Sequence, residues 1–135
     1  MFEVWAPAAK ALEVVLGDRS VPLERDARGY FRGLVDGVPV GAEYAFRLDG
    51  GPERPDPATR LQSKGVHGTS RVVARDYPWL HAPVALNLDD QVIYELHIGT
   101  FTAEGTFDAA VPHLAGLADL GVTAIEIMPV AAFPG

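Results

Sequence analysis

Apolar and polar residues alternate over short runs in the first half of the chain, and turn-forming residues separate the runs. These runs lie at residues 2–5, 11–16, 21–23, 29–35 and 43–48. The first and the last have the period of two of a half-buried strand, and Pro22 weakens the third. Short strands with turn signals about every eight to twelve residues predict an antiparallel, immunoglobulin-like β-sandwich.

The pattern changes in the last third of the chain. Residues 91–98 are rich in β-branched side chains, and residues 123–128 are almost continuously apolar, as in a strand buried on both faces. Between them a helix is predicted at about residues 107–120, which gives a βαβ unit with parallel strands and a right-handed crossover. The helical side expected to face the sheet consists of Phe107, Val111, Leu114 and Ala118. Because two parallel strands cannot cover their own faces, we expect this unit to open a larger domain.

The predicted helix has clear end signals. Thr106 suits an N-cap, Asp108 complements the positive end of the helix dipole, and Gly121 suits the position after the C-cap. Pro112 does not suit a helix interior, because its ring clashes with the carbonyl four residues earlier. We therefore expect the helix to kink there or to begin nearer Val111.

A segment rich in Pro, Gly and charged residues connects the two patterns. Residues 50–68 predict a long loop that packs on other structure, and residues 70–74 predict a last strand. Residues 76–88 predict a linker. We place the boundary near residue 85, with a sandwich domain and its linker at 1–85 and a second domain at 86–135.

Composition excludes several classes of protein. The chain has 135 residues, 48% of them hydrophobic, and no cysteine, which suits a globular cytoplasmic protein without disulfides. Its start lacks the basic and apolar regions of a signal peptide, and its apolar stretches are too interrupted to span a membrane. The net charge of −7 argues against a nucleic-acid partner.

The charge is unevenly distributed. All 11 Lys and Arg lie before residue 81, where acids balance them, so the whole net charge of −7 falls in residues 81–135. A complete domain usually mixes both signs on its surface, so we interpret this segment as an interior slice of a larger domain. An acidic patch that binds cations or a basic partner is the alternative.

Several residues are candidates for chemistry. Glu95 and His97 alternate onto one face of a predicted strand, either as an acid/base pair or, as we prefer, as a buried hydrogen-bonding pair. We interpret Glu126 as a paired structural carboxylate, with contact to substrate as the alternative. We interpret His67 as a solvated loop residue, and the alternative is that it reaches the active site of the full enzyme from its loop. No glycine-rich phosphate loop occurs and the histidines lack metal-ligand spacing, so we predict no cofactor and no metal.

Segments along almost the whole chain resemble a known family. Residues 94–107 and 120–130 resemble the first two barrel strands of the maltooligosyltrehalose trehalohydrolases, a branch of the α-amylase superfamily. Residues 2–9 resemble the opening of the β-sandwich before that barrel, and residues 54–60 together with residues 65–68 resemble a loop typical of this branch. The resemblance implies an α+β chain, with the sandwich followed by the first βαβ unit of a truncated (β/α) barrel.

The resemblance also implies a reaction. It is the retaining hydrolysis of the α-1,4-glucosidic bond next to the terminal trehalose of maltooligosyltrehalose, in trehalose biosynthesis. The family's paired carboxylates lie on later barrel strands, so we assign no catalytic residue here and expect the chain alone to be inactive. Because barrel sites lie at the C-terminal ends of strands, position alone makes some residues candidates for substrate binding. These are His97, Thr100, Phe101, Pro129 and Val130.

Other classes of function stay open. 1,4-α-glucan branching enzymes and isoamylase-type debranching enzymes share this two-domain opening. A non-catalytic glucan-binding module would need exposed aromatic side chains, whereas we expect Trp5 in the core and Trp79 between the domains. The remaining sandwich aromatics expected in the core are Tyr30, Phe31, Tyr44 and Phe46. A third class is a small structural protein that self-associates through exposed strand edges.

Overall fold

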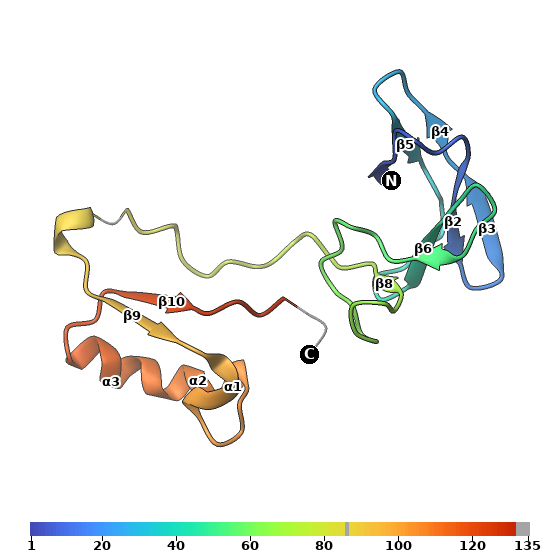
Figure 1. Cartoon of the computed structure of the whole chain (residues 1–135). Helices are drawn as coiled ribbons and strands as arrows, with labels where there is room; N and C mark the ends of the chain where they lie inside the picture. The colour runs from blue at the N-terminus through green and yellow to red at the C-terminus, as the bar shows by residue number, and fades with distance from the viewer. Residues whose placement is uncertain (86, 132–135) are drawn as a thin grey trace. The chain divides into compact units, whose positions relative to one another are not determined.

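The computed structural model describes residues 1–85 and 87–131, which form two compact units, Met1–Pro78 and Trp79–Ala131 (Figure 1). Strands dominate, and most of their pairings are antiparallel, as the sequence predicted. No described helix is both long enough and apolar enough to cross a membrane.

The first unit contains two antiparallel sheets. A three-stranded sheet has the order β1-β5-β4, with β1 at Phe2–Trp5, β5 at Tyr30–Gly33 and β4 at Glu24–Arg25. The second sheet has the order β3-β2-β6-β7, and β8 also pairs with β6. Its strands are β3 (Arg19–Pro22), β2 (Leu12–Leu16), β6 (Glu43–Leu48), β7 (Glu53–Arg54) and β8 (Ser70–Arg71).

One apolar core holds these sheets together. The first sheet contributes Val4 and Phe31, and the second contributes Leu12, Val14 and Phe46. Phe31 and Phe46 are each only 1% exposed. The inward side chains therefore come from both sheets, as in a sandwich, and the predicted antiparallel pairing is confirmed.

The prediction that Trp5 belongs to the core is wrong, because its side chain is 59% exposed. Its neighbour Val4 points into the core, so the alternation of the strand turns Trp5 outward. Tyr30 lies opposite Trp5 and is only half-buried, whereas the next residue, Phe31, is buried. Of the predicted core aromatics, Phe31, Tyr44 and Phe46 are confirmed.

The loop before β8 is packed, as its length predicted. Asp56 is buried and accepts a hydrogen bond from the Tyr44 hydroxyl at 2.7 Å, while its backbone N–H donates to Ser70 Oγ at 2.9 Å. Ser70 is fully buried. Burial, and then the Asp56 carboxylate, raise the pKa of Tyr44, so the hydroxyl keeps the proton that it donates.

A single carboxylate on β6 holds the rest of this loop. Glu43 accepts hydrogen bonds from Lys64 Nζ at 2.8 Å, Thr69 Oγ1 at 3.0 Å and Arg71 Nη2 at 3.3 Å. These donors, Lys64 first, lower the pKa of Glu43 from 4.5 to about 2. The ionised form is therefore favoured in the folded state.

The second unit is a βαβ unit. β9 (Ile93–Leu96) and β10 (Ala124–Ile127) are parallel, as predicted, and Glu95 lies opposite Glu126. A 3₁₀ turn, η1 (Leu88–Asp90), precedes β9, and the short helix α1 (Ile98–Phe101) follows it. The predicted strand at 91–98 is thus too long, because the chain turns into α1 from His97, the N-cap.

The helical crossover between β9 and β10 is interrupted at Pro112, as the sequence predicted. It consists of α2 (Phe107–Ala110), the 3₁₀ turn η2 (Val111–His113) and α3 (Leu114–Asp119). The hydroxyl of Thr106 accepts a hydrogen bond from the Ala109 N–H at 3.2 Å, which confirms the N-cap. Gly121 has a φ of +93°, as expected after the helix end.

The predicted contact side of this helix is not buried. Its members Phe107, Val111, Leu114 and Ala118 are all exposed in the unit. The buried core of the unit consists of Leu96, Ile98 and Ala110, with Phe101 packed against them. Neither η2 nor α3 has a buried residue, so the two-stranded unit leaves nearly the whole crossover exposed, and the prediction that these four residues face a sheet stays a prediction.

We expect the pH dependence of sandwich stability to follow Glu43. Because its folded pKa is lowered, its stabilisation is complete above the unfolded value of 4.5 and is lost as the pH falls toward about 2. Urea unfolding of the chain between pH 6 and pH 2 should show this loss. Glu43→Gln should be less stable at pH 6, with a shallower acid decline.

Lys64→Met provides the matched control, because Lys64 is the first cause of the shift. It should move the acid loss to higher pH without abolishing it. Parallel stability curves for all three proteins would contradict this role of Glu43.

Candidate functional site

The C-terminal ends of β9 and β10 bring the predicted positional candidates into one unit. His97 and Thr100 follow β9, and Pro129 follows β10. The pairing continues past β10, because the Met128 N–H donates to the Leu96 carbonyl at 2.9 Å. His97, Thr100 and Pro129 are all exposed, so their polar groups are accessible in this unit.

The backbone of α1 fixes the position of His97. The His97 carbonyl accepts hydrogen bonds from the N–H groups of Thr100, at 3.0 Å, and Phe101, at 2.9 Å. The imidazole Nδ1 lies 3.5 Å from Thr100 Oγ1. An imidazole beside a hydroxyl can donate and accept hydrogen bonds, which suits the recognition of sugar hydroxyls.

Gly99 allows the imidazole to lie this close. A Cβ atom at Gly99 would come within 2.9 Å of His97 Cε1 and 3.3 Å of Nδ1. Gly105 packs against the same turn, with a φ of +63° and a Cβ position only 3.1 Å from the Gly99 carbonyl oxygen. A Cβ at Gly99 would therefore displace the imidazole, whereas glycine at position 105 is favoured both by its positive φ and by the close backbone approach.

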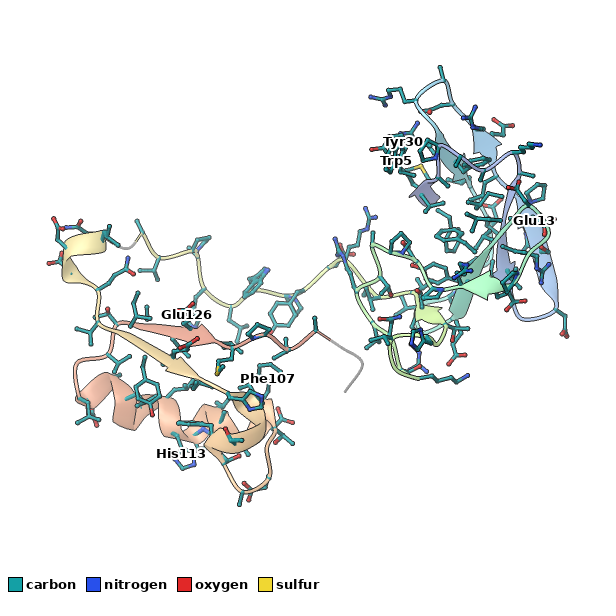
Figure 2. The ribbon with its side chains drawn as sticks, in the orientation of Figure 1. Trp5, Glu13, Tyr30, Phe107, His113 and Glu126 are labelled. Atoms are coloured by element: carbon teal, nitrogen blue, oxygen red, sulfur yellow. The ribbon has the colours of Figure 1, made fainter. Side chains whose placement is uncertain are left out.

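An aromatic cluster supports α1 from within the same unit. The Phe101 ring lies edge to face with Tyr94, at 6.3 Å between centroids, and with His113, at 5.7 Å. Figure 2 labels His113 on the helical crossover. Tyr94 and His113 were not among the predicted site residues, because contacts between a strand and an interrupted helix leave no periodic signal in the sequence.

The predicted Glu95–His97 pair is not formed within this unit, and its burial inside a complete barrel stays a prediction. Both side chains are exposed, and no hydrogen bond joins them in the described structure. Glu95 instead lies opposite Glu126, also exposed, so two carboxylates come from adjacent parallel strands. Figure 2 labels Glu126 on β10. The prediction that Glu126 is a paired structural carboxylate is likewise not supported, because its strand neighbour carries the same charge.

The remaining candidate residues are His67, Phe101 and Val130. His67 is exposed on a loop of the first unit, as predicted. Val130 is exposed and Phe101 is half-buried in the aromatic cluster. Within the described residues, no group of three or more His, Cys, Asp or Glu side chains could hold a metal ion.

Similarities to solved structures first indicate the class of protein. No family model matches the chain. Its structure is similar to a putative α-amylase from Salmonella typhimurium, with a TM-score of 0.90 and 42% identity over 99% of this chain and 23% of that one. It is also similar to a pullulanase type I from Bacillus subtilis, solved with maltose, with a TM-score of 0.78 and 26% identity over 99% of this chain and 23% of that one. These similarities relate the chain to the α-amylase family.

Similarities to curated proteins indicate one group of enzymes within this class. The chain is 48% identical to a malto-oligosyltrehalose trehalohydrolase from Saccharolobus solfataricus, over 99% of this chain and 24% of that protein. It is 41% identical to one from Deinococcus radiodurans, over 99% and 22%. The predicted resemblance to malto-oligosyltrehalose trehalohydrolases is therefore confirmed along the whole chain. The chain spans about a quarter of the length of these relatives.

We expect Gly99→Ala to displace the His97 side chain. The new methyl group would overlap the imidazole, which must rotate away from the Thr100 hydroxyl. A two-dimensional NMR spectrum of the His97 ring should show this as a change of its chemical shifts.

Gly116→Ala is the matched control within the helical crossover. A Cβ there meets no atom within 4 Å, so this change should leave the His97 signals in place. It should also stabilise the unit by about 0.5–1 kcal/mol, the usual gain for Gly to Ala inside a helix. Unchanged His97 signals in Gly99→Ala would show that the imidazole does not rest on Gly99.

Proposed function

We propose that this chain is part of a glycoside hydrolase that cleaves the α-1,4-glucosidic bond next to the terminal trehalose of maltooligosyltrehalose and releases trehalose. The observation that carries the proposal is 48% identity to a malto-oligosyltrehalose trehalohydrolase over 99% of the chain. A role in trehalose biosynthesis follows from this reaction. The cytoplasmic location stays a prediction.

In this proposal residues 1–85 form an immunoglobulin-like sandwich with its linker, and residues 86–135 begin a (β/α) barrel. Two observations support the assignment. The β9 and β10 strands are parallel and are joined by helices, which is the repeating element of a barrel. The two-stranded sheet also leaves apolar strand residues such as Ile93 and Ile127 exposed, as expected of a part of a larger sheet.

We propose that His97, Thr100 and Pro129 belong to the substrate-binding region of the parent enzyme. All three lie at the C-terminal ends of parallel strands, where barrel enzymes bind substrate. The His97 imidazole and the Thr100 hydroxyl offer hydrogen bonds in a fixed arrangement. The reaction requires two carboxyl groups about 5 Å apart, and the resemblance assigns them to later strands.

A related reaction is the second candidate. A 1,4-α-glucan branching enzyme from Xanthomonas axonopodis is 31% identical over 98% of this chain and 22% of that protein. The trehalohydrolase from Saccharolobus solfataricus is 48% identical over a similar length, so hydrolysis next to trehalose is preferred. In both candidates the partner of the parent enzyme is an α-glucan chain, and self-association through strand edges stays a prediction for the chain alone.

We expect the 135-residue chain to release no trehalose from maltooligosyltrehalose above the uncatalysed rate. Catalysis requires a matched carboxyl pair at fixed separation, which the resemblance assigns to strands beyond this chain. Trehalose is measured by chromatography, with the longer parent protein as the positive control. Turnover by the chain alone would place the active site within it, and a parent that forms branches instead would favour the second candidate.

His97→Ala in the parent should lower kcat/KM by about tenfold, the loss expected for one hydrogen bond to substrate. Steady-state kinetics on maltooligosyltrehalose measures this. His81→Ala is the matched control, because His81 is an exposed histidine that lies before β9 and not after a strand end. Equal values for both variants would remove His97 from the substrate-binding region.

A further inference from the structure

The outer face of the three-stranded sheet carries an aromatic pair that the proposed function does not use. Trp5 on β1 lies opposite Tyr30 on β5, and the next outward pair is Glu3 opposite Arg32. Residues opposite each other on antiparallel strands project to the same face, and Figure 2 shows Trp5 and Tyr30 together. The core lies on the other face of this sheet, with Val4 and Phe31.

The indole of Trp5 is held in one orientation while its ring stays open. Its Nε1–H donates to the Arg28 carbonyl at 3.1 Å, although the side chain as a whole is 59% exposed. The polar atom of the indole is therefore satisfied within the protein, and the ring offers its apolar surface to a ligand. An exposed aromatic ring that is fixed in place loses little conformational entropy on binding.

Charged groups surround the aromatic pair. Arg32 Nη1 donates to Asp26 Oδ2 at 2.6 Å, and Arg32 Nε donates to Glu3. The guanidinium groups of Arg32 and Arg28 lie 4.8 Å and 5.6 Å from the centroid of the Tyr30 ring. The Asp26 and Glu3 carboxylates hold the Arg32 guanidinium in place, and the remaining guanidinium N–H groups and carboxylate oxygen atoms can bond hydroxyl groups.

We propose that this face binds an α-glucan chain. One glucose ring would stack on Trp5, and its hydroxyl groups would form hydrogen bonds with the charged side chains around Trp5. The Trp5 face is defined by Glu3, Trp5, Asp26, Arg28, Tyr30 and Arg32. A sugar ring presents apolar C–H groups to an aromatic surface and hydroxyl groups at its edge, which matches an open indole with a charged border. The choice of an α-glucan rests on the proposed function.

The charges favour a sugar over a protein partner. A protein that covered Trp5 would also exclude water from the Arg32, Asp26 and Glu3 ion pairs, whose side chains are 30–41% exposed. Desolvation of ion pairs opposes such burial. A single glucan chain covers the indole and leaves these charges hydrated, so the Trp5 face suits a sugar better.

Affinity electrophoresis of the 135-residue chain in gels with amylopectin tests the proposal. The chain should be retarded relative to gels without glucan, and Trp5→Ala should bind about tenfold more weakly, which corresponds to about 1.4 kcal/mol. Trp5→Phe keeps an aromatic ring without the N–H and should retain most of the binding. Trp79→Ala, which removes the second tryptophan of the chain, is the matched control and should behave like the parent sequence.

Fluorescence gives an independent measurement. In Trp79→Phe the only tryptophan is Trp5, so its emission should change saturably with maltohexaose and stay constant with cellohexaose, the β-linked isomer. Circular dichroism should show that Trp5→Ala keeps the sandwich, since the side chain lies outside the core.

An unretarded chain, or equal retardation of Trp5→Ala, would overturn the proposal and would leave the Trp5 face to a protein partner. Trehalose release by the parent is a separate measurement. If the parent releases trehalose and the chain does not bind glucan, only the Trp5 site fails. If the chain binds glucan and the parent does not release trehalose, the proposed reaction fails and the binding site stands.

Discussion

The parallel pairing of β9 with β10 is the constraint on which the second unit depends. Parallel strands must be joined by a crossover, and the helical segment of that crossover covers one face of the pair. Leu96 of β9 and Ile98 of α1 are buried together with Ala110 of that crossover. The same pairing brings both strand ends to one edge, and His97, Thr100 and Pro129 share that edge for this reason.

Local signals predicted these elements well. The helix N-cap, the interruption and the helix end were predictable from the sequence, because each depends on one residue and the backbone next to it. These residues are Thr106, Pro112 and Gly121. The parallel strands also followed from their apolar composition and from the length of the segment between them. The sandwich followed from alternation and turn spacing, which again are local properties.

Side-chain environments were harder to predict. Trp5 is a large aromatic residue in a strand, and residues of this type are usually expected in the core. Because side chains alternate between the two faces of β1, however, Trp5 points to the outer face. Glu95 lies in β9 and His97 is the N-cap of α1, and the burial of both depends on what covers this end of the strand. The contacts of Phe101 with Tyr94 and His113 join three separate elements, and no spacing in the sequence encodes them.

The two opposed carboxylates, Glu95 and Glu126, also affect the colloidal behaviour of the chain. A second copy that approached this face would bring its own pair of carboxylates against them, in a segment that contains no Lys or Arg. Repulsion between like charges would then oppose the contact most strongly in dilute buffer, where ions screen least. Added salt would weaken this repulsion, so any association of copies through this face must strengthen as ionic strength rises.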